Sequence, residues 1–106
     1  MIIMGIDPGI KGAIALLDKA ALSVKVYDMP DTIAGLQSIL CDMPAVKLCC
    51  IEKPFYPKMI GMSNAAKIAE AFGAVKASLQ WRGIPTFEAR PADWKAALNL
   101  SPSKSA

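Results

Sequence analysis

The sequence has no histidine among its 106 residues. This absence excludes serine-type catalytic triads, imidazole general bases and most zinc sites. Any chemistry carried out by this chain must therefore use carboxylates, lysines, hydroxyls, thiols or a bound metal ion.

Long apolar runs are also missing. No run approaches the roughly 20 residues that cross a bilayer, so the sequence does not indicate a membrane protein. The first apolar segment follows no basic residues and leads into Asp7-Pro8-Gly9, which does not resemble the cleavage site of a signal peptide. Cys41, Cys49 and Cys50 match no metal-binding spacing, and we expect them to be small core residues in a reducing compartment.

The composition predicts a single mildly basic α/β domain over residues 1–106. Hydrophobic residues make up 54% of the chain and the net charge is +3. The basic residues gather after Glu52, where acids are sparse, so the second half of the chain is the expected face for a phosphate-bearing partner. These residues are Lys53, Lys58, Lys67, Lys76, Arg82, Arg90, Lys95 and Lys104.

The first eighteen residues predict two strands joined by a tight turn. Met1–Ile6 and Gly12–Leu17 are continuous apolar runs, typical of strands buried on both faces, and Pro8 and Gly9 supply the turn chemistry. Asp7 stands where the first strand ends. An ionised carboxylate there needs a cation, a donor or water, so Asp7 either accepts backbone N–H groups in the turn or binds a cation.

A second acid has an equivalent setting. Val46–Ile51 is another apolar strand candidate and runs directly into Glu52. If this strand lies parallel to the first, both acids fall at one edge of the sheet. Two carboxylates there would form a site of hard oxygen ligands suited to Mg²⁺ or Mn²⁺. The alternative is that Glu52 pairs with Lys53 or Lys58 on the surface.

The segment between these strands predicts a third strand and a crossover helix. Leu22–Asp28 alternates with period two, as in an antiparallel strand with one exposed face. Asp31 or Thr32 is the expected N-cap of the helix, which Met43-Pro44 ends. The apolar stripe of this helix consists of Ile33, Leu36, Ile39 and Leu40.

Pro54–Met62 contains two prolines and a glycine and is expected to be irregular. Phe55, Tyr56 and Lys58 lie in this loop, where exposed rings could stack on nucleic-acid bases. The alternative is a loop that folds back on the core.

A long helix is predicted from a cap at Ser63 or Asn64 to Trp81. One face carries an apolar stripe, and most of the remaining surface is small. This pattern fits close packing against the same helix of a second subunit, or packing within one subunit. The stripe consists of Ile68, Phe72, Val75 and Leu79.

Beyond Gly83 the sequence predicts a fifth strand at Ile84–Ala89 and a short helix at Arg90–Leu98. Ser101-Pro102 is a further helix start signal close to the last residue. We therefore expect a domain that is truncated at its C-terminus.

This order of elements resembles the ribonuclease H-like fold: a mixed five-stranded sheet, with three antiparallel strands followed by two parallel ones, and flanking helices. The motifs Ile6-Asp7-Pro8-Gly9, Ile51-Glu52 with Phe55 three residues on, and Phe87-Glu88 leading to Lys95 resemble the RuvC-type Holliday-junction resolvases, especially their short phage relatives.

The resemblance implies a Mg²⁺-dependent endonuclease that cleaves four-way DNA junctions, acts as a homodimer through the helix Ser63 to Trp81, and works in the cytoplasm of a bacterial or phage-infected cell. It implies that Asp7 and Glu52 bind metal, with Mn²⁺ able to substitute for Mg²⁺. It makes Lys95 and Lys104 basic catalytic residues near the cleaved phosphate. The expected DNA contacts are Phe55, Tyr56, Lys58, Arg90, Lys95 and Lys104.

The chain departs from the family at its end. The family takes its last one or two acids from a closing helix that this chain would reach only beyond Ala106, so the resemblance implies an under-ligated site. The hypothesised reaction is phosphodiester hydrolysis with two Mg²⁺ ions about 4 Å apart. Asp7 would bridge these ions, and Lys95 or Lys104 would offset the phosphate charge.

Two other functions stay open. A fragment of an actin-type or sugar-kinase-type phosphotransferase also opens with a Gly-Ile-Asp stretch, and ATP binding without junction binding would favour it. A non-catalytic junction-binding module, natural or created by truncation, would bind junctions in EDTA and leave them uncut in Mg²⁺ even after the missing tail is restored.

Overall fold

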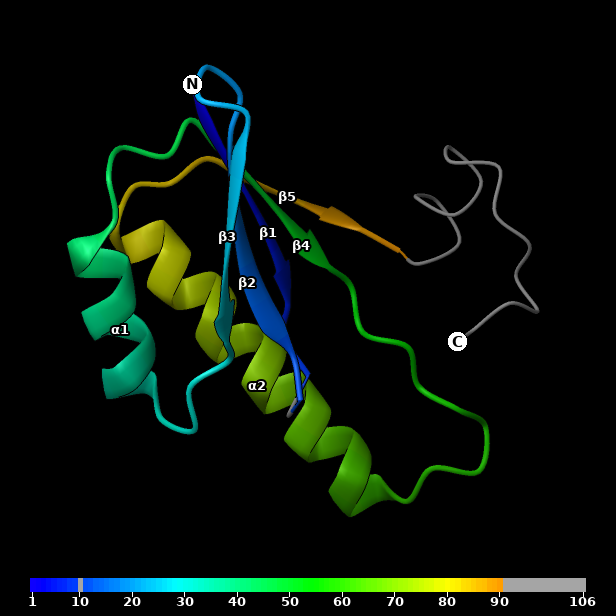
Figure 1. Cartoon of the computed structure of the whole chain (residues 1–106). Helices are drawn as coiled ribbons and strands as arrows, with labels where there is room; N and C mark the ends of the chain where they lie inside the picture. Colours follow the sequence, from blue (N-terminus) through cyan, green and yellow to red (C-terminus); the bar gives the residue numbers. More distant parts are fainter. Residues whose placement is uncertain (10, 91–106) are drawn as a thin grey trace, which may run out of the picture.

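The computed structural model describes residues 1–9 and 11–90 (Figure 1). The predictions on residues 91–106, namely the Arg90–Leu98 helix beyond its first residue, the start signal at Ser101 and the roles of Lys95 and Lys104, lie outside the described residues. The described elements are β1 (Ile2–Asp7), β2 (Ala13–Asp18), β3 (Ser23–Asp28), α1 (Ile33–Asp42), β4 (Leu48–Glu52), α2 (Met62–Trp81) and β5 (Thr86–Ala89).

The predicted mixed sheet is confirmed. Its strand order is β3-β2-β1-β4-β5. The pairs β1–β2 and β2–β3 are antiparallel, because short turns join their strands. The pairs β1–β4 and β4–β5 are parallel, since α1 and α2 provide the long crossovers that parallel strands need. The sheet therefore places the ends of β1, β4 and β5 at one edge.

The hydrophobic core lies between the two helices and one face of the sheet (Figure 1). Burial alternates along β1, β2 and β4, so only every second side chain reaches the core. The prediction that the first two strands are buried on both faces is therefore wrong, and neither described helix covers the other face. The buried core consists of Met4, Ile6, Ile14, Leu16, Leu36, Leu40, Met43, Cys49, Ile51, Val75 and Leu79.

The third strand is more exposed than its sequence pattern predicts. Leu22 does not belong to the strand: it has a φ of 53° and is 88% exposed. Val24 and Val26 lie on the sheet face away from the helices and are also exposed, whereas Tyr27 packs against the core. The predicted period of two along this strand is confirmed, but the face that carries Val24 and Val26 is the exposed one.

The helix caps agree with the sequence at one helix and differ at the other. Thr32 caps α1 by accepting a 3.0 Å hydrogen bond from the Gly35 amide, which is typically worth about 1 kcal/mol. Helix α2 begins at Met62 with Gly61 as N-cap and has no side-chain cap, so the predicted cap at Ser63 or Asn64 is wrong. The glycine already supplies the extended backbone that starts the helix.

The cysteines only partly match their predicted role. Cys49 is buried and Cys50 half-buried, but Cys41 is exposed on α1. Burial, with a smaller contribution from the neighbouring Cys50, raises the pKa of the Cys49 thiol to about 12. No helix in the described part of the chain is both long and apolar enough to span a membrane.

Candidate metal centre

Strand pairing brings Asp7 and Glu52 together. Ile6 on β1 is the register partner of Ile51 on β4, and the two acids are the next residues on these parallel strands. Because Ile6 and Ile51 point into the core, the acids that follow them point away from it, at strand ends that share a cleft with the first turns of α2. Neighbouring strands lie roughly 4.8 Å apart, so the two acids stand side by side at the ends of their strands.

The turn after β1 fixes the orientation of Asp7. Its Oδ1 accepts a 3.1 Å hydrogen bond from the Gly9 amide, as expected of an acid that opens a Pro-Gly turn. Its Oδ2 accepts no hydrogen bond from the described residues. The structural role of Asp7 therefore occupies one carboxylate oxygen and leaves the other available to a cation.

Gly12 is needed for the same turn to close. Its amide donates to the Gly9 carbonyl over 2.9 Å, and its own carbonyl accepts from the Met29 amide over 3.0 Å. A Cβ atom at position 12 would overlap the carbonyl oxygen of Asp7. Only glycine permits this close approach, so the position of Asp7 depends on Gly12.

Glu52 is half-buried at the end of β4. The next amide, that of Lys53, donates to the Ala89 carbonyl over 2.7 Å, which anchors the strand end to β5. Burial first and the Glu52 carboxylate second raise the pKa of the Cys50 thiol, in keeping with two side chains on one face of β4. Neither Lys53 nor Lys58 forms a salt bridge within the described residues, so the alternative of a surface ion pair with Glu52 finds no support there.

Both acids line one cleft of about 600 Å³. Phe55, which is 75% exposed, also lines it, whereas Tyr56, Lys58 and Arg90 are exposed outside it. The loop that carries Phe55 is irregular, as predicted. The described residues that line it are Asp7, Pro8, Gly9, Glu52, Lys53, Pro54, Phe55, Ile60, Asn64, Lys67, Ile68 and Ala71.

The contribution of α2 to this cleft was missed in the sequence. Asn64, Lys67, Ile68 and Ala71 follow the i, i+3, i+4, i+7 spacing of a single helix face. That spacing could have shown that the helix face with the apolar stripe begins with two polar residues, Asn64 and Lys67. It was not recognised because the alanines made the helix look uniformly small around the stripe.

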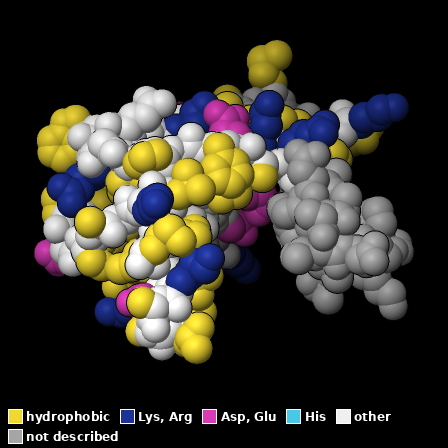
Figure 2. Space-filling view, turned by 90° about the horizontal axis from the view of Figure 1, so that it is seen from above, with side chains coloured by type: hydrophobic (Ala, Val, Ile, Leu, Met, Phe, Trp, Pro, Cys, Tyr) yellow, Lys and Arg dark blue, Asp and Glu magenta, His cyan; other side chains and the backbone are white. Residues whose placement is uncertain are grey.

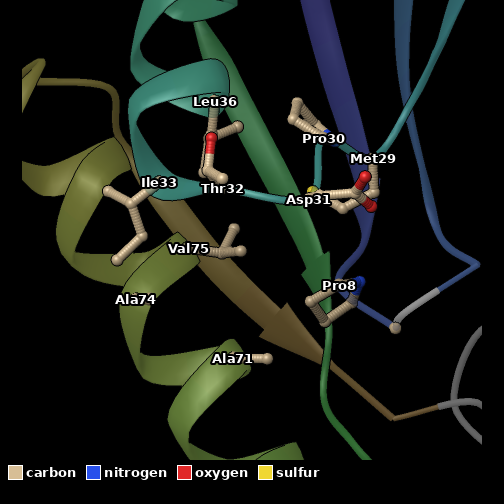
Figure 3. A pocket seen from close by; sticks show the side chains of 11 residues that line it. Pro8, Met29, Pro30, Asp31, Thr32, Ile33, Leu36, Ala71, Ala74 and Val75 are labelled. Carbon is tan, nitrogen blue, oxygen red and sulfur yellow. The ribbon is translucent and has the colours of Figure 1, made fainter.

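A smaller hollow of about 210 Å³ adjoins the cleft and shares Pro8, Gly9 and Ala71 with it. In Figure 3, Ala71 and Val75 project from α2 toward Pro8, and the start of α1 closes the other side. Mostly apolar side chains line this hollow, so it offers few groups for chemistry. It lies between α1, α2 and the turn after Asp7.

Glu88 on β5 is not a third acid of this site. It is the register partner of Ile51 and therefore lies on the helix side of the sheet. There its Oε2 accepts a 3.1 Å hydrogen bond from the Lys76 ammonium. Residues 1–9 and 11–90 contain no cluster of three or more side chains suited to metal binding.

The donor set fits a hard divalent ion. Mg²⁺ is commonly held by one or two carboxylates, keeps several waters and takes further oxygens from substrate phosphates. Asp7 offers an available Oδ2, and Glu52 lines the same cleft. The pair therefore suits one hydrated Mg²⁺ or Mn²⁺ ion better than a fully ligated pair of ions.

No family model matches the sequence. No curated protein matches it either. Among solved structures, the chain is similar to Thermus thermophilus RuvC in complex with a Holliday junction substrate, with a TM-score of 0.69 and 22% identity over 93% of this chain and 72% of that one. A second T. thermophilus RuvC structure matches with a TM-score of 0.62 and 24% identity over 93% of this chain and 69% of that one. The predicted ribonuclease H-like fold is thereby confirmed.

Proposed function

We propose that this protein is a Mg²⁺-dependent endonuclease that resolves four-way DNA junctions. The observation that carries the proposal is the pairing of Asp7 and Glu52 at neighbouring parallel strand ends within one cleft. The fold supports it, because T. thermophilus RuvC shares this fold and was solved with a Holliday junction substrate. DNA as substrate would place the protein in the cytoplasm of a bacterial or phage-infected cell.

In this proposal Asp7 and Glu52 hold the divalent ion through their carboxylate oxygens. The ion supplies Lewis acidity toward a phosphoryl oxygen and lowers the pKa of a bound water. The Gly9 amide fixes one oxygen of Asp7, so the carboxylate is oriented before substrate arrives. Mn²⁺ would serve in place of Mg²⁺, since both prefer carboxylate and water ligands.

The cleft wall would position the DNA strand. Phe55 exposes most of its ring at the cleft and would stack on an unpaired base near the branch point. Tyr56, Lys58 and Arg90 are exposed and would contact DNA outside the cleft. Lys95 and Lys104 would offset negative charge on the cleaved phosphate.

The proposed protein is a homodimer that packs through α2. One exposed face of this helix carries a row of small side chains beside Glu70 and Gln80, and small side chains let two helices approach closely. Met62 and Trp81, at the ends of this face, are 89% and 73% exposed. The small exposed residues are Ala66, Ala69, Gly73 and Ala77.

The test uses the 106-residue chain and synthetic four-way junctions with labelled strands. We expect nicking near the branch point in Mg²⁺ or Mn²⁺, none in EDTA, and loss of nicking to the detection limit in Asp7→Asn and Glu52→Gln. Unchanged cleavage by Asp7→Asn would contradict the proposal. Junction binding in EDTA without nicking in Mg²⁺, also in a chain extended by the closing helix that carries the family's last acids, would instead identify a non-catalytic binding module.

A further inference from the structure

The cleft has a positively charged wall that the metal site does not use. Lys67 and Asn64 come from the first two turns of α2 and line the same cleft as Asp7 and Glu52. Lys67 is three positions after Asn64, so the two lie on one face of the helix. No acidic residue lies in the first turn of α2, and Glu70, three positions after Lys67, forms no salt bridge with it.

Lys67 differs from the other lysine on this helix. The Lys76 ammonium is engaged by Glu88 at 3.1 Å and lies 4.7 Å from the centroid of the Phe72 ring. Lys67, in contrast, forms no salt bridge or hydrogen bond with any described residue, although it shares a cleft with two carboxylates. Its charge is therefore not neutralised and is available to an anion that enters the cleft.

A DNA strand in this cleft faces an electrostatic conflict. The carboxylates of Asp7 and Glu52 repel the phosphates that must approach them, and a divalent ion offsets this repulsion only at the phosphate it touches. The next phosphate along the strand needs a separate cation. An ammonium group with an amide one helical turn away can supply one charge and further N–H donors to phosphate oxygens.

We propose that Lys67 and Asn64 form a phosphate-binding site that holds the DNA strand at a phosphate next to the one positioned by Asp7 and Glu52. This inference rests on the proposed function, because it takes a DNA strand as the occupant of the cleft. Lys67 is a positioning residue here. Its ammonium group attracts a phosphate and so fixes the path of the DNA strand, and the Asn64 amide adds an uncharged hydrogen-bond donor.

The opposite end of the sheet provides a matched control. Lys47 precedes β4, at the far end of the strand from Glu52, and is exposed without a salt bridge in the described part of the chain. Seen from that end, basic side chains are dispersed among acidic and hydrophobic ones (Figure 2). Removing the Lys47 charge lowers the net charge as much as removing that of Lys67, but at a surface with no cleft acids.

The experiment measures binding of a labelled four-way junction in EDTA by fluorescence anisotropy, across a range of NaCl concentrations. Each phosphate contact contributes about 0.9 to the slope of log affinity against log salt. We expect Lys67→Gln to reduce the magnitude of this slope by about 0.9, the contribution of one phosphate contact. Lys67→Arg should keep the wild-type slope, because it retains the charge. Lys47→Gln should keep the wild-type slope. Asn64→Ala should weaken binding at every salt concentration while leaving the slope unchanged.

Equal slopes for wild type and Lys67→Gln, or equal losses for Lys67→Gln and Lys47→Gln, would overturn this inference and leave the nuclease proposal standing. A wild-type chain that does not bind junctions would overturn both. Because Lys67 is exposed, its variants should fold normally, and an unchanged thermal midpoint checks this.

Discussion

Lys76 on α2 holds Glu88 of β5 on the helix side of the sheet, through a 3.1 Å hydrogen bond between the ammonium group and Oε2. The pair connects the second crossover helix to the last described strand. The strand register directs Glu88 away from Asp7 and Glu52, and Lys76 pairs with it there. Glu88 therefore has a structural role, whereas Asp7 and Glu52 form the candidate metal site.

Glu88→Gln should accordingly affect stability slightly and catalysis not at all. Both side chains of the pair are more than one third exposed, so its loss should cost about 0.2–1 kcal/mol of unfolding free energy. Urea titration measures this cost, and junction nicking in Mg²⁺ provides the functional comparison. Cleavage reduced as strongly as in Asp7→Asn would show that Glu88 belongs to the site after all.

Gly12→Ala should disrupt both the fold and the metal centre, because the new Cβ would collide with the Asp7 carbonyl. Steric overpacking of this kind typically costs about 1–3 kcal/mol. Gly5→Ala is the control on the same strand pair, since nothing lies within 4 Å of its Cβ position. Thermal unfolding and Mn²⁺ titration should separate the two variants, and equal behaviour would contradict the role assigned to Gly12.

The Cys49 thiol predicts a loss of stability in alkali. Its pKa rises from 9.0 to about 12 on folding, so above pH 9 the unfolded chain loses a proton that the folded chain retains. The contribution of this thiol to the free energy of unfolding is constant below pH 9. Between pH 9 and pH 12 it decreases by at most about 1.4 kcal/mol per pH unit.

Denaturant titrations of wild type and Cys49→Ala at several pH values test this expectation. The difference in unfolding free energy between them should shrink as the pH rises above 9. Cys41→Ala, which removes an exposed thiol, should parallel wild type throughout. A constant difference between wild type and Cys49→Ala would contradict the assignment.

Gly73 tests the proposed dimer. A Cβ at this position meets nothing within 4 Å, so Gly73→Ala should be accommodated by the single chain and gain up to about 1 kcal/mol from helix propensity. Gly73→Glu would place a charge on the small-residue face and should yield monomers. Sedimentation velocity measures this directly, and an unchanged mass for Gly73→Glu would contradict dimerisation through α2.

Much of the fold could be predicted because its signals are local. The Asp7-Pro8-Gly9 turn and the Thr32 cap each follow from adjacent residues, and the parallel pairing of β1 with β4 follows from the helix between them. From these, the convergence of Asp7 and Glu52 was predicted correctly. The face on which Val24 lies could not be predicted, because period two does not say which set of side chains meets the helices.

The α2 wall of the cleft was missed for a related reason. Lys67 and Asn64 become part of the site only through the approach of α2 to the ends of β1 and β4. That approach is set by packing of Val75 and Leu79 several turns away. Spacing within the helix identifies its faces, but a tertiary contact decides which face borders the carboxylates.

Asp7 and Glu52 reach their final positions at different stages of folding. The turn that orients Asp7 closes between residues a few positions apart, on the microsecond scale typical of hairpins. Glu52 arrives only after a crossover that spans β2, β3 and α1, and such long-range pairing is slow. Affinity for a divalent ion should thus appear late in refolding, so ion binding would report completed assembly of the sheet and not the first collapse of its hairpins.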